Sequence, residues 1–399
     1  MKRRNFCKIA GMGLVALPLG QRRILGATDS MSPLFWVKGI PDDPYWQKPS
    51  HRHAGVDTLI DLMGGQGLKF YKSSVVSLTS GPRGMIGAGD VVLIKVNAQW
   101  KYRGCTNSDV IRGLIQRILE HPKGFHGEVV IFENGQGRGS LRCDTSAAYG
   151  DSYVRANANR FSHSFIYLVN QVFKDPRVSA FLLDPIRSNF IGNDDHVQNG
   201  YRLLGNVSYP CFTTAGGRRV ELKEGTWNGS GHTPNLKLIN VPVLKHHDVG
   251  GSEITASLKH VYGLLSMADG NSGFRHYAGL GETCGRMLAE VRTPALNIVD
   301  AIWVSHASLK GLPADTTFRA NQLLASQDPV ALDYYAAKYI LYPIDKNTRH
   351  RPYFSGITSW LTSARQTINR IGITSPENGV YLSRVNQYES QMKVFIAEA

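Results

Sequence analysis

The chain has 399 residues, of which 42% are hydrophobic, and 45 Lys and Arg against 31 Asp and Glu give a formal net charge of +14. This length and apolar content allow one large core or two modest ones and exclude a disordered chain. No Arg-rich helix, zinc-finger spacing or RNA-binding aromatic pattern accompanies the charge, so we expect no nucleic-acid partner. The basic excess fits an anionic substrate or an ordinary solvated surface.

Residues 1–27 predict an export signal. Arg3 and Arg4 precede an apolar stretch from Ile9 to Leu19 that is too short to span a bilayer, and residues 25–27 suit cleavage. This segment resembles a twin-arginine signal, whose substrates cross the membrane folded and often with a cofactor inserted. We expect a periplasmic or otherwise exported protein without a transmembrane span in the mature chain, which would carry a net charge of +8. An uncleaved anchor is the alternative.

Four cysteines follow the signal, and no two of them form a C-x-x-C pair, so an iron–sulfur motif is absent. In an oxidising compartment they could form two disulfides in any of three pairings, and buried thiols are the alternative. These cysteines are Cys105, Cys143, Cys211 and Cys284.

The segment 28–89 is expected to be an irregular N-terminal arm with a short helix over 55–63. The main domain, 90–345, opens with VVLIKVN at 91–97, which predicts a buried strand. Thr106 and Asp109 then resemble a capping pair for a helix that runs to about residue 120.

GEVVIF at 127–132 predicts a second strand, and strand, helix and strand at these lengths indicate a parallel βαβ unit. Ligands in such folds usually lie beyond the carboxyl ends of the strands, an edge that carries Lys95, Asn97 and Glu133. The ENGQGRGS segment that follows lacks the G-x-G-x-x-G order and is predicted to be a flexible loop rather than a dinucleotide site.

The remaining segments complete an α/β fold with a mostly parallel sheet flanked by helices. Residues 140–235 are expected to form a long irregular insertion. LNIVDAIWV at 296–304 predicts a strand that contains Asp300, and Asp328 is expected to cap a helix with Pro329 at its first position. The tail, 346–399, is expected to be a helical extension.

The densest group of chemically active residues lies between 236 and 267. A buried strand to Leu244 is followed by Gly250 and Gly251, which allow a turn, and by Ser252, which can cap a helix. The apolar positions of this helix, and on another face Thr255 and Lys259, follow helical spacing. We expect a small anion to bind between Lys245, the Gly250 and Gly251 amides, and Lys259.

Five of the thirteen histidines fall within residues 232–276, which favours a transition-metal site because such metals need two to four converging imidazoles and carboxylates. The expected ligands are His246, His247, His276 and Asp300. A hydrogen-bonded surface cluster and a metal-free catalytic base are the alternatives. Lys245 and Lys259 could act as base or nucleophile beside His247, or be two salt-bridged lysines.

Several segments, VLIKVN, INVPVLKHH, SLKHVYG, NIVDAI and ASQDPVALD, resemble in order and spacing the family known as domain of unknown function 362 (DUF362), over roughly residues 90–340. His260 departs from the family pattern, where Asn is expected. Many relatives carry a ferredoxin-like cysteine cluster that this chain lacks, which implies a partner for any redox role. The resemblance singles out Lys95, Asn97, Lys245, His247, Thr255, Lys259, Gly263, Arg275 or His276, Asp300, Asp328 and Asp333.

A fainter similarity is to the nickel-pincer lactate racemases, whose cofactor-holding order is echoed by Pro242, His247, Gly250 with Gly251, and Lys259. Two functional hypotheses follow. The first is an exported metal- or cofactor-dependent enzyme that acts on a small anionic substrate, with Lys95, Asn97 and Thr255 among the binding residues. The second is a non-catalytic protein that binds an anion or cofactor for a partner redox system.

Overall fold

A computed structural model describes the chain except residues 1–30, 46–49, 184–199, 248–252, 267–272 and 374. The expected export signal and both Gly250 and Gly251 therefore lie outside the described residues.

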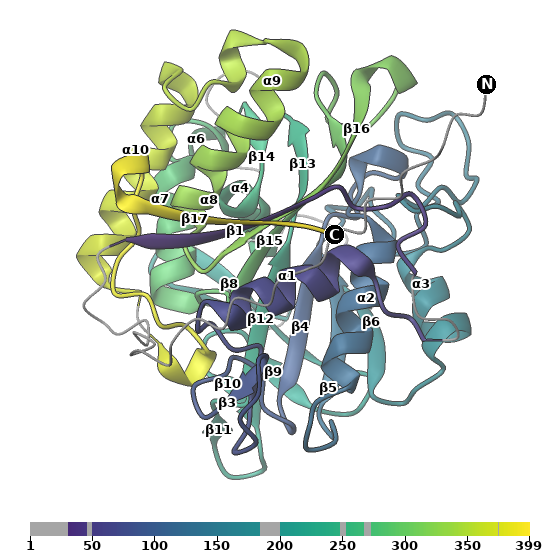
Figure 1. The fold of residues 1–399 in the computed structure, drawn as a ribbon, viewed down its shortest axis with the longest axis vertical. Coiled ribbons are helices and arrows are strands. Elements are labelled where there is room, and N and C mark those ends of the chain that lie inside the picture. Colours follow the sequence, from purple (N-terminus) through teal and green to yellow (C-terminus); the bar gives the residue numbers. More distant parts are fainter. Residues whose placement is uncertain (1–30, 46–49, 184–199, 248–252, 267–272, 374) are drawn as a thin grey trace, which may run out of the picture.

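A ten-stranded sheet forms the centre of the molecule (Figure 1). Eight strands follow the order β17-β1-β16-β15-β12-β4-β5-β6, while β13 pairs with β15 and β14 pairs with β13. Their bounds are β1 (Ser32–Lys38), β4 (Val91–Val96), β5 (Glu128–Glu133), β6 (Val178–Leu182), β12 (Leu236–Val241), β13 (Val243–His246), β14 (Ile254–Thr255), β15 (Leu296–Ser305), β16 (Thr317–Ser326) and β17 (Met392–Glu398).

The sheet is mostly parallel, as predicted. Strands β6, β5, β4, β12 and β15 run in one direction, and β16 is antiparallel to both β15 and β1. The crossover between β4 and β5 passes through helix α2 (Ser108–Leu119), so this part of the chain is the βαβ unit that the sequence predicted. The α/β fold class is therefore confirmed.

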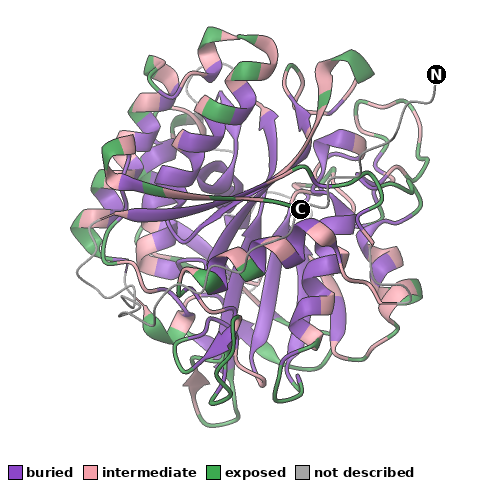
Figure 2. Cartoon of the chain, viewed as in Figure 1, coloured by how far each residue is buried: buried purple, intermediate pink, exposed green. Residues whose placement is uncertain are grey.

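Helices cover both faces of this sheet, and the central strands β4, β5, β12 and β15 are buried along almost their whole length (Figure 2). Along β4 the side chains alternate, so that Val91 and Leu93 join one core and Val92 and Ile94 join the other. Helices α4, α7, α8 and α10 pack on the first face, and α1 and α2 on the second. The helices are α1 (Ala54–Gly65), α2 (Ser108–Leu119), α3 (Phe165–Tyr167), α4 (Ser257–Val261), α6 (Gly273–His276), α7 (Leu280–Arg286), α8 (Pro329–Ala336), α9 (Tyr342–Asp345) and α10 (Ser355–Ile371).

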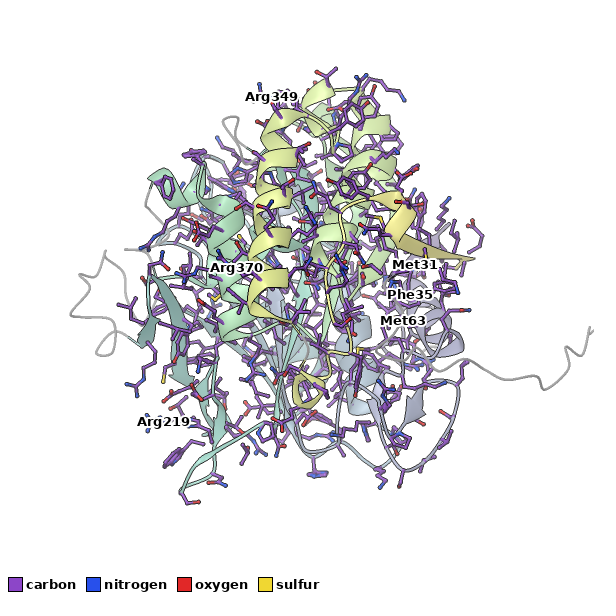
Figure 3. All side chains as sticks on the ribbon, turned by 90° about the vertical axis from the view of Figure 1, so that its left-hand side faces the viewer. Met31, Phe35, Met63, Arg219, Arg349 and Arg370 are labelled. Atoms are coloured by element: carbon purple, nitrogen blue, oxygen red, sulfur yellow. The ribbon has the colours of Figure 1, made fainter. Side chains whose placement is uncertain are left out.

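The middle section is more ordered than an irregular insertion. Its described part supplies β6 to the central sheet and forms a second, five-stranded sheet in the order β11-β10-β9-β8-β7. Arg219 of this small sheet lies at the opposite end of the molecule from Arg349 (Figure 3). The strands are β7 (Tyr201–Leu204), β8 (Val207–Thr213), β9 (Arg219–Glu221), β10 (Gly225–Trp227) and β11 (His232–Thr233); a further pair, β2 (Tyr71–Lys72) and β3 (Ser80–Gly81), lies after α1.

Both ends of the described chain enter the central sheet, which the sequence did not predict. The expected arm contains β1, and the expected helical extension closes with β17, which pairs with β1 in parallel over their whole lengths. Phe35 of β1 packs in the same core as Met63 of α1 (Figure 3). Strand β1 is buried on both faces, so its sequence lacks the alternation that marks a half-exposed strand.

Candidate functional site

A polar cavity of about 240 Å³ lies beyond the carboxyl ends of β4 and β5, where ligands bind in parallel α/β sheets. Strand β13, the chain around α4 and the loop after β5 form its other walls. It is lined by Lys95, Asn97, Gln99, Trp100, Glu133, Asn134, Gln136, Arg138, Lys245, His247, Thr255, Lys259, His260, Tyr262, Gly263, His276 and Leu309. We call it the lysine pocket.

An ion pair between Lys95 and Glu133 forms the floor of the lysine pocket. Lys95 continues the alternation of β4 on the face that packs against α4, and its Nζ lies 2.6 Å from Glu133 Oε1. The other Glu133 oxygen accepts the Ala98 amide at 3.1 Å. Burial lowers the pKa of Lys95, and its nearness to Glu133 opposes this shift. The pair is thus buried, bonded and fixed in position.

Gly263 makes room for this ion pair. A Cβ atom at this position would lie 3.0 Å from Lys95 Nζ and 3.4 Å from Glu133 Oε1, which is tighter than most natural Cβ contacts. Because the glycine has no side chain, the backbone after α4 can approach the two charged groups closely.

Asn97 connects two strand ends at the mouth of the pocket. Its side-chain oxygen accepts the Val243 backbone amide at 2.9 Å, while its backbone N–H donates to the Thr106 hydroxyl at 2.8 Å. Thr106 in turn donates to the Val241 carbonyl, so it does not cap α2 as expected. The N-cap is Asn107, whose side chain accepts two amides of the first helical turn.

Lys245 is a buried residue of β13 that lines the pocket. The chain breaks at Pro242 into β12 and β13, and β13 leaves β12 to pair with β15, which brings Lys245 beside the Lys95 strand end. Its Nζ donates to the Gly104 carbonyl at 2.7 Å. Burial lowers the pKa of Lys245 from 10.5 to about 7, so near neutral pH a substantial fraction of this amine is uncharged.

Helix α4 is shorter than predicted, and its start is occupied by a carboxylate. Residues 254–255 form β14, which pairs with β13, and the helix begins only at Ser257, because the strand pairing of Thr255 with Lys245 overrides the local helical spacing. Asp333 of α8 accepts the amides of Ser257 and Leu258 at 2.7 and 2.9 Å. A ligand therefore does not need to fill these two amide positions, whereas the Gly250 and Gly251 amides of the expected anion site lie outside the described residues.

His247 and His276 come together at the edge of the pocket. Their ring centroids lie 5.6 Å apart, and His276 also stacks on Tyr262 at 5.4 Å. Burial and the nearby Lys259 hold the pKa of His247 well below its usual range and lower the pKa of His276 to about 4. Both imidazoles are neutral at physiological pH.

The other two expected metal ligands lie elsewhere. His246 points to His350, with their ring nitrogens 3.0 Å apart. Asp300 accepts the backbone amides of Asn107 and Ile302, at 2.7 and 3.1 Å, and so anchors the start of α2. Among the residues that the structure describes, no group of three or more His, Cys, Asp or Glu is placed to hold a metal. The four expected ligands therefore do not converge. His246 and His247 are neighbours in an extended segment, so their side chains point in opposite directions.

Two further predicted residues fall within the pocket region. Thr255 lines the cavity from β14, opposite Lys245 in the strand pairing. His260, where the resemblance led us to expect Asn, is buried and bonded through Nδ1 to the Asn240 side-chain oxygen at 2.7 Å.

The loop after β5 supplies pocket residues that the sequence had not indicated. Gln136 bonds to Gln99 at 2.8 Å, and the Arg138 guanidinium lies 5.6 Å from the centre of the Trp100 ring. The position of this loop directly after a predicted parallel strand was the signal for these residues, because that edge of the sheet was already the expected site.

The electrostatics of the lysine pocket favour an anion. Its described lining carries the basic groups of Lys95, Lys245, Lys259 and Arg138 against one carboxylate, Glu133. In a small cavity within the protein such an excess attracts negative charge more strongly than it would in bulk water.

The comparisons with curated proteins and with solved structures found no match. Among the residues that the structure describes, no helix combines the length and apolar character that a membrane crossing requires. A family model does match, over a narrower range than the resemblance first indicated, and this range carries Lys245, His247 and Lys259. Residues 235–338, from β12 into the chain after α8, are similar to the family described as domain of unknown function (DUF362).

Proposed function

We propose that the lysine pocket binds a small anionic molecule and that the protein acts on it by proton transfer. The observation that carries this proposal is the lining of the pocket, with three lysines and one arginine against one carboxylate. The volume of about 240 Å³ lies below the range of roughly 300–1,000 Å³ of drug-sized sites, which favours a ligand of few atoms.

Lys245 and His247 supply the groups for proton transfer. They lie two residues apart at the end of β13. At neutral pH, burial leaves part of the Lys245 amine uncharged and keeps the His247 imidazole neutral. A neutral amine or imidazole accepts a proton, while Lys259 and Arg138 balance the charge of the bound anion. An enzyme is the favoured hypothesis, and a binding protein with the same pocket is the alternative.

Isothermal titration calorimetry with oxalate and with inorganic phosphate tests the binding step. We expect at least one of the two to bind, and the Lys259→Met variant to lose about tenfold or more in affinity. Lys123→Met is the matched control, because Lys123 is exposed and lies outside the pocket lining. An unchanged affinity in Lys259→Met, or no binding of either anion to the native chain, would refute the proposal.

A transition-metal cofactor is the second candidate, favoured by the contact between His247 and His276. These imidazoles could provide two ligands, fewer than the three or four that protein sites usually supply, and substrate atoms would complete the shell. The similarity to nickel-pincer racemases would place Lys259 at such a cofactor, although Pro242 does not line the pocket.

Elemental analysis of protein purified after export tests this candidate. Near-stoichiometric metal that is lost in His247→Ala but kept in His232→Ala would support it, since His232 lies in the small sheet. Conversion of L-lactate to D-lactate by the same preparation would support the racemase similarity, and metal-free protein that binds oxalate would favour the first candidate.

Export through the twin-arginine pathway is also proposed. Replacement of Arg3 and Arg4 by Lys should retain the protein in the cytoplasmic fraction, because the pathway reads the arginine pair of the signal. Unchanged fractionation of the variant would contradict this route.

A further inference from the structure

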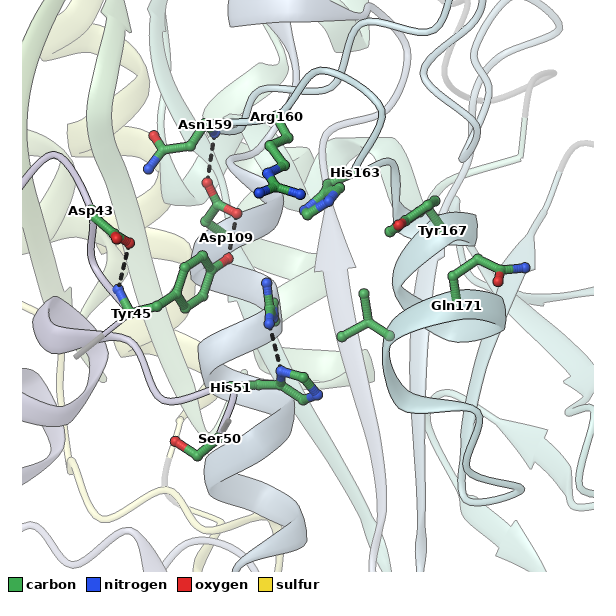
Figure 4. Close-up of a pocket in the computed structure, with 12 residues that line it drawn as sticks. Asp43, Tyr45, Ser50, His51, Asp109, Asn159, Arg160, His163, Tyr167 and Gln171 are labelled. Carbon is green, nitrogen blue, oxygen red and sulfur yellow. Dashed lines mark hydrogen bonds between the residues drawn. The ribbon is translucent and has the colours of Figure 1, made fainter. Parts of the chain in front are cut away.

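A second cavity, of about 700 Å³, lies between the N-terminal arm, the first turns of α2 and the chain around α3 (Figure 4). It shares no lining residue with the lysine pocket, so it is a separate site. The groups that decide its chemistry are two arginines, two histidines and two tyrosines, together with two aspartates.

The two aspartates of this cavity are already bonded within the protein. Asp109 accepts the hydroxyl of Tyr45 through one oxygen and the Asn159 amide, at 2.7 Å, through the other. Asp43 accepts the Tyr45 amide at 3.3 Å. Figure 4 shows both aspartates turned to these partners, which reduces their capacity to attract a cationic ligand.

The basic groups, in contrast, keep donors to spare. Arg112 donates one N–H to His51 at 2.6 Å and lies 4.1 Å from the centre of the Tyr45 ring, but its Nε has no partner among the described residues. Arg160 is exposed, and its guanidinium has no ion-pair partner within the described part of the chain. An arginine fork without a carboxylate is suited to a ligand oxyanion.

His163 gives a second, independent indication of a ligand. Its side chain is 8% exposed, and Nδ1 has no hydrogen-bond partner among the described residues. A buried polar atom of this kind loses its hydration without compensation, unless a bound molecule completes it.

An aromatic platform lies beside these donors. The His163 ring stacks on Tyr167 with centroids 4.7 Å apart and planes 12° from parallel, and Val172 continues the apolar surface. In Figure 4, Tyr167 and His163 lie across the cavity from Tyr45. Flat aromatic side chains favour a ligand that carries a ring of its own.

We propose that this cavity binds an aromatic oxyanion, either a carboxylate or a phosphate ester. The ligand ring packs against Tyr167 and Val172, and its oxyanion pairs with the exposed Arg160 guanidinium in the cavity that Arg112 and His163 also line. A neutral aromatic molecule would leave the guanidinium unpaired, and an inorganic anion would leave the aromatic surface uncovered.

Titration calorimetry with phenyl phosphate and 4-hydroxybenzoate tests the proposal and distinguishes the two oxyanions. At least one should bind about tenfold or more tightly than both phenol and inorganic phosphate. Arg160→Ala should remove this advantage, while Arg142→Ala, at another exposed arginine outside both cavities, should leave it unchanged.

The lysine pocket provides the decisive comparison, because it also attracts anions. Lys259→Met should not alter the binding of the aromatic anion, and His163→Phe, which keeps the ring stack but removes the nitrogens, should weaken it. Binding that falls in Lys259→Met and persists in Arg160→Ala would place the ligand in the lysine pocket and overturn the inference. Equal affinity for phenol, or no binding of either aromatic anion, would overturn it as well.

Discussion

The protonation state of Lys245 affects the net charge of the lysine pocket. Its amine sits 2.7 Å from the Gly104 carbonyl with Lys95 nearby, and burial lowers its pKa to about 7. A bound anion would favour the charged amine and raise this pKa again, so binding and protonation are linked.

This linkage predicts how anion affinity depends on pH. Below about pH 7 the empty pocket already holds a charged Lys245, and above it binding must be accompanied by proton uptake. The affinity for oxalate, whose charge does not change in this range, should therefore fall from about pH 7 to pH 9, by at most about tenfold per pH unit. Lys245→Met should flatten the profile measured by calorimetry, and an equally steep profile in the variant would contradict the assignment to Lys245.

The same shift predicts a change in stability. An unfolded lysine keeps its proton up to about pH 10, whereas the folded Lys245 releases it near pH 7, so the unfolded state binds more protons between these values. The native chain should therefore gain stability relative to Lys245→Met as the pH rises through this window, by at most about 1.4 kcal/mol per unit. Urea unfolding of both proteins at several pH values measures this difference, and a constant difference would argue against the lowered pKa.

Gly263 tests the close packing around the ion pair. In Gly263→Ala the new Cβ would lie 3.0 Å from Lys95 Nζ, so the pair must shift, at a cost of about 1–3 kcal/mol. Oxalate binding should weaken as well. Gly65→Ala is the control, because its Cβ meets no atom within 4 Å at the end of α1, and it should not lower the stability. Equal effects of the two substitutions would show that Gly263 is not needed for the ion pair.

At the scale of elements, α8 holds the start of α4 through one carboxylate. Asp333 accepts the amides of Ser257 and Leu258, and the short helix that follows presents Lys259 to the pocket. The helix has five residues, too few to be stable without tertiary contacts, so this contact fixes the position of the lysine.

Asp333→Asn should therefore disturb both stability and binding. The amide has one acceptor oxygen, so its NH₂ group would face an amide donor, and about 1–3 kcal/mol of unfolding free energy should be lost. Asp315→Asn, at an exposed position, is the control. The midpoint of urea unfolding and the oxalate affinity measure the two effects, and a normal affinity in Asp333→Asn would show that Lys259 is positioned by other contacts.

Elements with strong local patterns were predictable from the sequence, and those defined by distant partners were not. β4, α2 and β5 follow from apolar periodicity, and Asp328 caps α8 as its sequence context predicted. The break between β12 and β13, in contrast, depends on whether the chain beyond Pro242 pairs with β15. Strand β17 likewise depends on β1, more than 300 residues away, and no local signal reports that contact.

The site was predictable in location and only partly in composition. Lys95, Asn97, Lys245, His247 and Lys259 were all placed at strand or helix ends, and all of them line one cavity. Arg138 comes from a loop whose conformation the sequence does not specify. Asp300 is directed to the amide of Asn107, a contact between distant segments that spacing cannot reveal.

At the scale of the whole molecule, the packing of the core and the proposed export route both require the cysteines to be reduced thiols. The four described cysteines are thiols; Cys105 and Cys143 lie in the core between the sheet and α2, where the Cys105 thiol donates to the Tyr102 carbonyl at 3.1 Å. A protein that folds before export must reach its native state in a reducing compartment. Packing, without any disulfide, would then have to hold the loops around this pair.

Reduction should therefore leave the thermal stability unchanged. A disulfide between Cys105 and Cys143 would close a loop of roughly 40 residues and contribute about 4 kcal/mol, which would raise the melting temperature by several degrees. Scanning calorimetry of exported protein with and without dithiothreitol measures this contribution, and mass spectrometry after thiol alkylation counts the free cysteines. A clear loss of stability on reduction that is absent in Cys143→Ser would contradict this prediction. It would show that Cys105 and Cys143 form a disulfide after export.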